Sequence, residues 1–125
     1  MSNKQKVLVV DDEVNISTAI QFLMEDNGFE VATAYNGIEA LVKLDAFRPD
    51  LILLDVMMPK MNGFEVAKRI RQNPANMDIQ IIFLTAKGTD RDKMEGYGSG
   101  GDVYLTKPFD NQALVDLVIE TLAFG

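Results

Sequence analysis

Short apolar runs recur along the chain, and they predict five β-strands. Runs of this kind, without polar alternation, are typical of strands that are covered on both faces of a sheet. Polar or charged residues follow most of the runs. The predicted strands are residues 7–10, 29–34, 51–54, 79–84 and 103–105.

Between these runs, apolar residues recur at the spacing of amphipathic helices. Asn36, with Glu39 three residues later, resembles a capping box that opens the second helix. Pro74 is expected to help end the third helix, and residues 90–98 are predicted to form a fourth helix with few apolar side chains. The predicted core positions of the other helices are Ile16, Ile20, Leu23 and Met24; Ile38, Leu41 and Val42; Phe64, Ala67 and Ile70; and Leu114, Leu117, Val118 and Leu122.

Residue pairs that favour turns lie between the predicted elements. Asn27-Gly28 is predicted to end the first helix, and Asn62-Gly63 to precede the third. Five strands that alternate with five helices predict one α/β domain over residues 1–125, with a parallel sheet, right-handed crossovers and helices on both faces.

The residues that close the predicted strands differ from the runs before them, because they are polar. In a parallel sheet the carboxyl ends of the strands lie at one edge, where ligands bind. We therefore expect these side chains to converge on that edge. They are Asp11, Asp12, Asp55, Thr85 and Lys107.

The expected edge has the parts of a phosphoryl acceptor. When carboxylates lie within a few ångströms of one another, either the pKa of one of them is raised or a cation binds between them. The chain has no His and no Cys, so a metal would have oxygen ligands, and Mg²⁺ suits such a site. A carboxylate can attack phosphorus to form an aspartyl-phosphate. Lys107 would supply a fixed cation for the phosphoryl oxygens, and Thr85 a neutral hydroxyl donor.

Composition narrows the function further. The chain has 125 residues, 47% of them hydrophobic, which is enough for a core without disulfides. Its net charge of -7 argues against nucleic-acid binding by this chain, because phosphates repel an acidic surface. The amino terminus is polar and lacks a signal peptide, and no apolar stretch approaches the roughly 20 residues that cross a bilayer. We expect a cytoplasmic protein that does not contact a membrane.

Four motifs occur in order at the predicted strand ends: LVVDDE at 8–13, LLDVMMPKMNG at 53–63, LTAK at 84–87 and YLTKPF at 104–109. Together they resemble the receiver domain of two-component response regulators, the group that includes chemotaxis regulators. The resemblance runs from about residue 6 to residue 122. It implies a flavodoxin-like, doubly wound sheet of five parallel strands in the order 2-1-3-4-5, with five helices.

The resemblance also implies a role for each carboxylate. Asp55 matches the phosphoacceptor, which takes its phosphoryl group from a phosphohistidine on a sensor histidine kinase or a histidine phosphotransfer protein. In the family, the residue matching Asp12 binds Mg²⁺ directly and the one matching Asp11 acts largely through water. The backbone carbonyl of Met57 matches the third protein ligand. Because the chain has no histidine, the phosphohistidine must be on another protein.

Three further residues match the family's switch. Thr85 and Lys107 match the residues that contact the phosphoryl oxygens, and Tyr104 matches the aromatic that turns inward when the threonine moves. The peptide bond between Lys107 and Pro108 matches one that is usually cis, which the proline makes chemically accessible. The resemblance implies a switch and not an enzyme with independent turnover.

In the family, the fourth helix, fifth strand and fifth helix form the output face, which contacts an output domain or a downstream protein. Here four glycines fall between residues 96 and 101, where the family commonly has Gly-Ala-Asp-Asp-Tyr. Each glycine disfavours helix by about 1 kcal/mol relative to alanine, so a short or mobile fourth helix is expected. The chain ends just after the last predicted helix. Both a stand-alone receiver domain and a piece of a larger regulator would be consistent with this end.

Simpler roles exist for most of these residues. The acids at 11–13 could serve merely to cap a helix. Asp55 could begin a turn, and Thr85 could be a loop hydroxyl. Lys107 could be a surface lysine, and Tyr104 a half-buried core aromatic. The charged run at 90–93 is most simply a solvated helix face. Three methionines are predicted to pack and not to bind a ligand: Met57, Met58 and Met61.

Three other classes of protein remain as alternatives. A flavin-nucleotide electron carrier shares this sheet order, but it needs a glycine- and hydroxyl-rich phosphate loop where this chain has Asp-Asp-Glu. A haloacid-dehalogenase-like phosphatase would need a second Asp two residues after the first, and position 13 is Glu. The third is an interaction scaffold of the same fold that works without phosphorylation.

Overall fold

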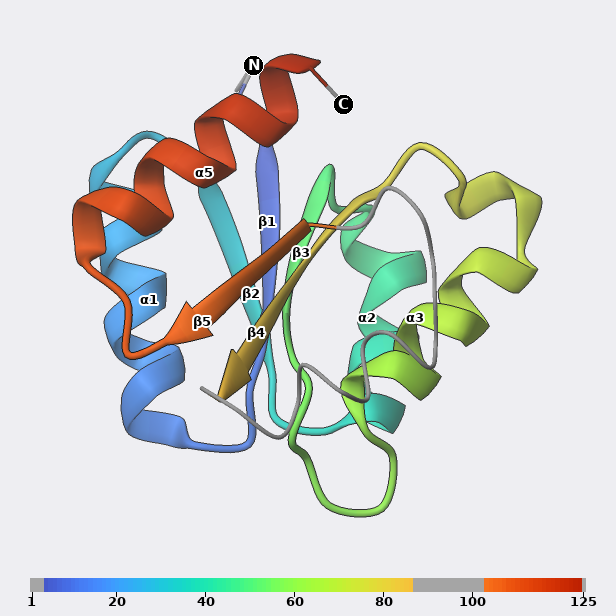
Figure 1. The fold of residues 1–125 in the computed structure, drawn as a ribbon. Coiled ribbons are helices and arrows are strands. Elements are labelled where there is room, and N and C mark those ends of the chain that lie inside the picture. The colour runs from blue at the N-terminus through green and yellow to red at the C-terminus, as the bar shows by residue number, and fades with distance from the viewer. Residues whose placement is uncertain (1–3, 87–102, 125) are drawn as a thin grey trace.

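A parallel sheet of five strands forms the centre of the molecule (Figure 1). The computed structural model describes residues 4–86 and 103–124. The strand order is β2-β1-β3-β4-β5, so the order that the resemblance implied is confirmed. The strands are β1 (Lys6–Val10), β2 (Glu30–Ala34), β3 (Leu51–Asp55), β4 (Gln80–Ala86) and β5 (Val103–Lys107).

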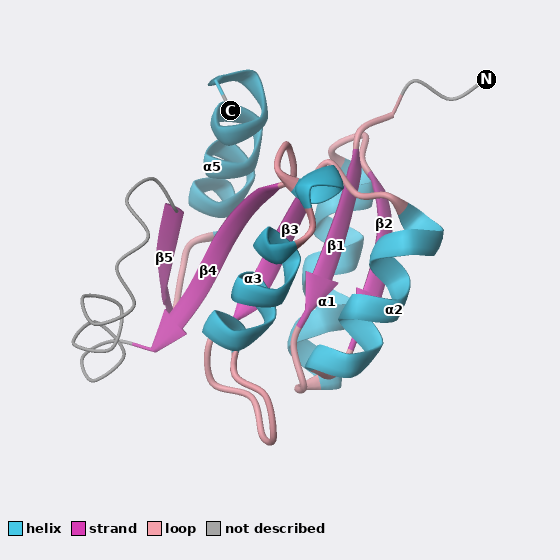
Figure 2. Ribbon diagram, turned by 90° about the vertical axis from the view of Figure 1, so that its right-hand side faces the viewer, coloured by secondary structure: helices cyan, strands magenta, loops and turns pink. Residues whose placement is uncertain are grey.

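Helices cover both faces of this sheet, as the alternation of elements predicted (Figures 1 and 2). One face carries α1 (Val14–Asp26) and α5 (Asn111–Phe124). The other carries α2 (Gly37–Phe47) and α3 (Gly63–Gln72), and a short 3₁₀ helix, η1 (Pro74–Asn76), follows α3. The predicted fourth helix and the glycines at 96–101 lie outside the described residues. None of the helices that are described is long and apolar enough to cross a bilayer.

Two hydrophobic cores explain why the strands lack polar alternation. Successive side chains of a strand point to opposite faces of the sheet, and both faces are covered here. In β1, Leu8 and Val10 lie in the core with residues of α2 and α3. Val7 and Val9 lie in the core with residues of α1 and α5.

Helix ends follow the predicted signals. The Asn36 side chain accepts a hydrogen bond from the Glu39 backbone N–H at 2.8 Å, and thereby caps α2. Asn62 caps α3 in the same way. Gly28, just after α1, has a φ of 90°, a conformation that residues with side chains rarely adopt. Pro74 begins η1, where α3 has already ended.

Four strands run further than the sequence predicted: β1 begins one residue earlier, at Lys6, β3 includes Asp55, and β4 and β5 each extend by two residues at their carboxyl ends. Thr85 pairs with Thr106, and Ala86 pairs with Lys107. The prediction that β4 would end before Thr85 and β5 before Lys107 was therefore wrong. Apolar runs locate the buried part of a strand, whereas backbone pairing continues into the polar residues that follow it.

The predicted buried face of α2 was also partly wrong. Ile38 and Val42 are 65% and 67% exposed. The buried residues of α2 are instead Gly37, Ala40 and Leu44. Small residues at two of these positions let α2 pack closely, so the larger side chains of Ile38 and Val42 face away from the sheet.

The prediction that the methionines pack holds for two of the three. Met58 is buried, and Met61 packs against the same core. Met57 is 53% exposed, so the packing role predicted for it was wrong. It lies two residues after the end of β3, where the chain has left the covered part of the sheet.

Candidate functional site

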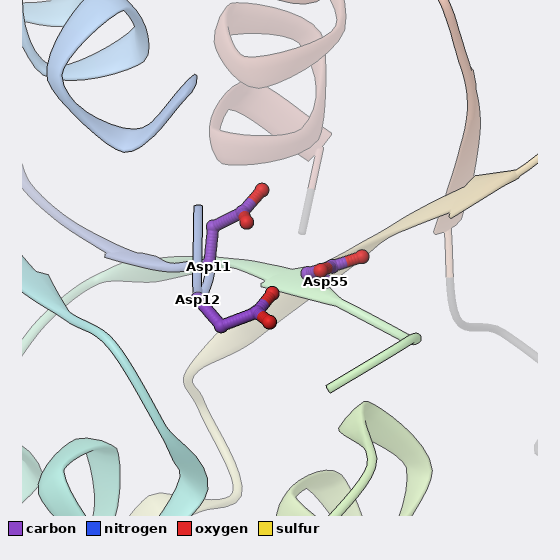
Figure 3. Close-up of side chains that lie close together, drawn as sticks. All are labelled: Asp11, Asp12 and Asp55. Atoms are coloured by element: carbon purple, nitrogen blue, oxygen red, sulfur yellow. The ribbon is translucent and has the colours of Figure 1, made fainter. Parts of the chain in front are cut away.

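Three carboxylates meet at the carboxyl edge of the sheet (Figure 3). Val10 in β1 pairs with Leu54 in β3, so the residues that follow them, Asp11 and Asp55, reach the edge together. One carboxylate oxygen each from Asp11, Asp12 and Asp55 lie within 4.8 Å of one another. Asp11 and Asp55 are buried, and Asp12 is exposed. The predicted convergence of the three acids is therefore confirmed.

The chain orients two of these acids through its own backbone. The Asp11 N–H donates to the Ala34 carbonyl at 3.1 Å, and the Asp11 carboxylate accepts from the Glu13 N–H at 2.9 Å. The Asp55 carboxylate accepts from the Met57 N–H at 3.3 Å. Both acids thus make turn-like local contacts, as the simpler role of Asp55 predicted, whereas α1 has no side-chain hydrogen bond at its N-cap, so the capping role predicted for the acids at 11–13 was wrong. These contacts also direct the two carboxylates to the shared edge.

Lys107 connects the two buried carboxylates. Its Nζ donates to Asp11 Oδ2 at 3.1 Å and to Asp55 Oδ1 at 3.3 Å. Lys107 is the last residue of β5 and is only partly exposed. The role of a free surface lysine is therefore excluded. The peptide bond from Lys107 to Pro108 is cis, as the resemblance implied.

Burial and the neighbouring charges shift the pKa of the Asp55 carboxyl. Burial, and after it the nearby charge of Asp11, raise the pKa of the Asp55 carboxyl from 3.8 to about 6. Lys107 and the Met57 N–H act in the opposite direction. Burial alone would lower the pKa of Lys107, but the charges of Asp55 and Asp11 and their hydrogen bonds outweigh it, so that pKa is raised. Near neutral pH, the Asp55 carboxylate is therefore largely ionised beside the Lys107 ammonium.

These residues fit a hard divalent cation such as Mg²⁺. Three carboxylates against the one ammonium of Lys107 leave an excess of two negative charges. All the side-chain donors are oxygens, and Mg²⁺–oxygen bonds of about 2.1 Å place opposite ligands about 4 Å apart. Separations of up to 4.8 Å suit this octahedron if one acid shifts slightly or acts through water.

Thr85 and Tyr104 share the face of the sheet that α2 and α3 cover. The side-chain period of two places Thr85 on the same face of β4 as Phe83, and Thr85 is buried. The Tyr104 ring stacks on Phe83 with 5.2 Å between ring centroids. Tyr104 is half-buried, as its simpler role predicted. Phe83 was missed as part of this group, although its place two residues before Thr85 is a signal that could have identified it.

Comparison with known proteins decides the family. The family model of the response regulator receiver domain matches residues 7–119. The chain belongs to the response regulator receiver domain family. It is accordingly a phosphoacceptor domain of two-component signal transduction. The match favours this interpretation over a flavin carrier or a dehalogenase-like phosphatase.

Similar receiver domains occur in larger regulators. The chain is 49% identical over 105 residues to the alkaline phosphatase synthesis transcriptional regulatory protein PhoP of Bacillus subtilis, covering 84% of this chain and 43% of that protein. It is 40% identical over 110 residues to the DNA-binding dual master transcriptional regulator RpaA of Synechocystis, covering 88% and 46%. This receiver domain spans about half the length of the curated relatives that it matches.

Solved structures of other response regulators share this fold. A putative response regulator from Chloroflexus aurantiacus has a TM-score of 0.88 and 35% identity, over 97% of this chain and 99% of that one. The chemotaxis protein CheY4 of Vibrio cholerae has a TM-score of 0.85 and 36% identity, over 94% and 98%. The flavodoxin-like fold that the resemblance implied is thus confirmed for this receiver domain.

Proposed function

We propose that Asp55 is the phosphoacceptor of this receiver domain. The observation that carries this assignment is the position of its carboxylate, buried at the end of β3 with Lys107 Nζ at 3.3 Å and two further carboxylates beside it. The donor is a phosphohistidine of a sensor histidine kinase or a histidine phosphotransfer protein. Such kinases use ATP, so we place the reaction in the cytoplasm.

The proposed metal ligands are the carboxylates of Asp11, Asp12 and Asp55 and the backbone carbonyl of Met57. When bound there, Mg²⁺ would neutralise charge that develops on the transferred phosphoryl group. The chain supports this role with an oxygen-only donor set and an excess of two negative charges over Lys107. Met57 contributes by position, because its N–H already contacts Asp55 and its carbonyl belongs to the same turn.

In the proposed reaction, one oxygen of the Asp55 carboxylate attacks phosphorus. The phosphorus–nitrogen bond of the donor breaks, and the imidazole leaves as the neutral base after taking up a proton. Lys107 and the Met57 N–H both contact Oδ1, so we assign Oδ2 as the attacking atom. Lys107 is close enough to follow the new phosphoryl oxygens with a small movement.

Phosphorylation would then change the surroundings of the site. A phosphoryl group adds about -1.5 to -2 charges and strong acceptor oxygens, which attract Lys107 and the Thr85 hydroxyl. Movement of Thr85 would leave space for Tyr104, which lies on the same face of the sheet next to Phe83. A shift from 1:99 to 99:1 between the two states needs about 5.5 kcal/mol, within reach of a few charge-assisted bonds.

The proposed readout is a face that includes β5, α5 and the fourth helix predicted in the family. This face would contact an output domain or a separate downstream protein. The chain itself would contact neither nucleic acid, because its net charge is -7, nor a membrane. It would catalyse only its own phosphorylation and dephosphorylation, without independent substrate turnover.

Labelling with acetyl phosphate tests the assignment. Incubation with Mg²⁺ is expected to add one acid-labile phosphoryl group, detected by intact-protein mass spectrometry, and EDTA should abolish it. Asp55→Asn should remove the label, whereas Asp45→Asn, an exposed acid on α2, should retain it. Labelling that survives Asp55→Asn unchanged would contradict the assignment. An absence of labelling in the original chain would instead favour the phosphorylation-independent scaffold.

A further inference from the structure

Gly63 lies in unusually close contact with the backbone of the proposed phosphoacceptor. A Cβ atom at position 63 would lie 2.5 Å from the Asp55 carbonyl oxygen and 3.0 Å from the Val56 Cα. Both neighbours are backbone atoms, which cannot rotate away as the end of a side chain can. Any other residue at position 63 must therefore displace either the first turn of α3 or the peptide that follows Asp55.

The same contact closes the loop between β3 and α3. The Val56 carbonyl accepts hydrogen bonds from the Gly63 N–H at 3.0 Å and the Met58 N–H at 3.2 Å. The Val56 N–H in turn donates to the Leu84 carbonyl in β4 at 3.0 Å. The start of α3 is thus tied through Val56 to the sheet, directly beside Asp55.

We propose that Gly63 is a positioning residue for phosphotransfer: its lack of a side chain lets α3 begin against the Asp55–Val56 peptide, and this contact fixes the Asp55 carboxylate and the Met57 carbonyl relative to Asp11 and Asp12. The inference rests on the proposed function of Asp55. It adds a residue that does not itself touch the phosphoryl group or the metal.

A second glycine supports the loop from the other side. A Cβ atom on Gly37, the first residue of α2, would lie 2.8 Å from Val66 Cγ2 and 2.9 Å from Met61 Sδ. Met61 belongs to the loop, so α2 and α3 hold it between them. The Gly37 neighbours are the ends of side chains, which can yield more easily than the backbone next to Gly63. Substitution at Gly37 should therefore have a smaller effect of the same kind.

The test compares Gly63→Ala with Gly28→Ala in the whole chain. Mg²⁺ alone is titrated by calorimetry, labelling by acetyl phosphate is timed at saturating Mg²⁺, and urea unfolding measures stability. Gly63→Ala is expected to weaken Mg²⁺ binding about 10-fold, as loss of a group that orients a ligand typically does. It should slow labelling by about 10- to 100-fold, because misplacement of a reacting atom by about 1 Å has that effect.

Gly28→Ala is the matched control for loss of stability. A Cβ there meets no atom within 4 Å, but the φ of 90° strains any residue other than glycine. Gly28 lies just before β2, at the amino ends of the strands, whereas Asp55 lies at their carboxyl ends. Gly28→Ala should therefore lower stability while Mg²⁺ affinity and labelling rate stay at their original values.

The outcomes separate this inference from the proposed function. A folded Gly63→Ala protein with unchanged Mg²⁺ affinity and labelling would overturn the positioning role and leave Asp55 as the acceptor. If Gly63→Ala does not fold, Gly37→Ala takes its place, with a smaller loss of Mg²⁺ affinity and labelling rate expected. Unchanged binding and labelling in that variant would overturn the inference that close packing of this loop positions Asp55. Failure of the unsubstituted chain to bind Mg²⁺ or to be labelled would contradict the proposed function itself.

Discussion

The ammonium of Lys107 neutralises part of the negative charge that would otherwise attract a metal ion. Its ammonium lies 3.1 Å from an Asp11 oxygen and 3.3 Å from an Asp55 oxygen. Removal of this charge leaves the carboxylates with greater attraction for another cation. We therefore expect Lys107→Met to bind Mg²⁺ more tightly, by at least about 10-fold, because two unit charges about 4 Å apart interact by about 1 kcal/mol in water and about 4 kcal/mol near a protein surface. It should nevertheless accept phosphoryl groups more slowly, because the transferred oxygens lose their cation.

Calorimetric titration with Mg²⁺ and timed acetyl phosphate labelling measure the two effects. Lys68→Met, which removes an exposed lysine from α3, serves as the control and should change neither. Weaker Mg²⁺ binding in Lys107→Met would show that Lys107 organises the carboxylates more than it competes for them.

The raised pKa of Asp55 has a consequence for stability. Because that pKa is about 6 in the folded protein against 3.8 ordinarily, the folded state holds the Asp55 proton more tightly than the unfolded state. The ionised carboxylate therefore destabilises the fold above pH 6, and this penalty disappears as pH falls from 6 to 3.8. Without Mg²⁺ near neutral pH, Asp55→Asn should raise the free energy of unfolding by about 2–3 kcal/mol.

Urea unfolding across this pH range checks the prediction. The advantage of Asp55→Asn should shrink toward zero near pH 4, and Asp26→Asn, at the exposed end of α1, is measured alongside as the control. An Asp55→Asn protein that is less stable than the original near neutral pH would mean that the contact with Lys107 outweighs the effect of burial.

The sequence predicted the acids of the site better than the loop that positions them. Asp11, Asp55 and Lys107 could be identified because each lies where an apolar run ends, and parallel strands bring such ends together. The position of Gly63 against the Asp55 carbonyl depends on how the loop turns back on the sheet. That path is a tertiary property with no periodic signal in the sequence.

At the scale of elements, α2 shows what hydrophobic spacing can and cannot predict. Asn36 correctly predicted where the helix begins, but Ile38 and Val42 proved to be exposed. Polar substitution at these two positions should therefore leave stability within about 0.5 kcal/mol of the original. Leu44→Ala, on the buried face of the same helix, should lower it by about 2–5 kcal/mol.

Urea unfolding of Ile38→Gln, Val42→Gln and Leu44→Ala compares the two faces under one set of conditions. A loss of more than about 1 kcal/mol in either Gln variant would show that these side chains are covered in solution, since exposed substitutions rarely have such effects.

The capping residues allow a second comparison between elements. Asn36 and Asn62 accept hydrogen bonds from the third N–H of α2 and α3, at 2.8 and 3.0 Å. Asn36→Ala and Asn62→Ala should each lower the free energy of unfolding by about 1 kcal/mol, because a helix N–H loses its acceptor. Urea unfolding measures these stabilities. If either variant is as stable as the original chain, water replaces the hydrogen bond that its asparagine accepts.

At the scale of the whole molecule, the fold explains why one edge carries the chemistry. In β1 and β3, which are covered on both faces, polar residues occur only at the strand ends, and the order β2-β1-β3-β4-β5 brings these two strands side by side. The negative charge excess at this edge then favours a divalent cation, and a phosphoryl group could approach the same edge. Stability should therefore rise with Mg²⁺, by about 2.7 kcal/mol at 100 times its dissociation constant.

The central claim is that Asp55 accepts the phosphoryl group, and chemical trapping tests it most directly. The chain is labelled with acetyl phosphate and Mg²⁺ and then treated with sodium borohydride, which reduces an acyl phosphate to an alcohol. Peptide mass spectrometry then locates the altered residue. The account predicts reduction at position 55, and only when Mg²⁺ is present. Reduction at Asp11 or Asp12 instead, or at no residue of a chain that has taken up phosphate, would contradict it.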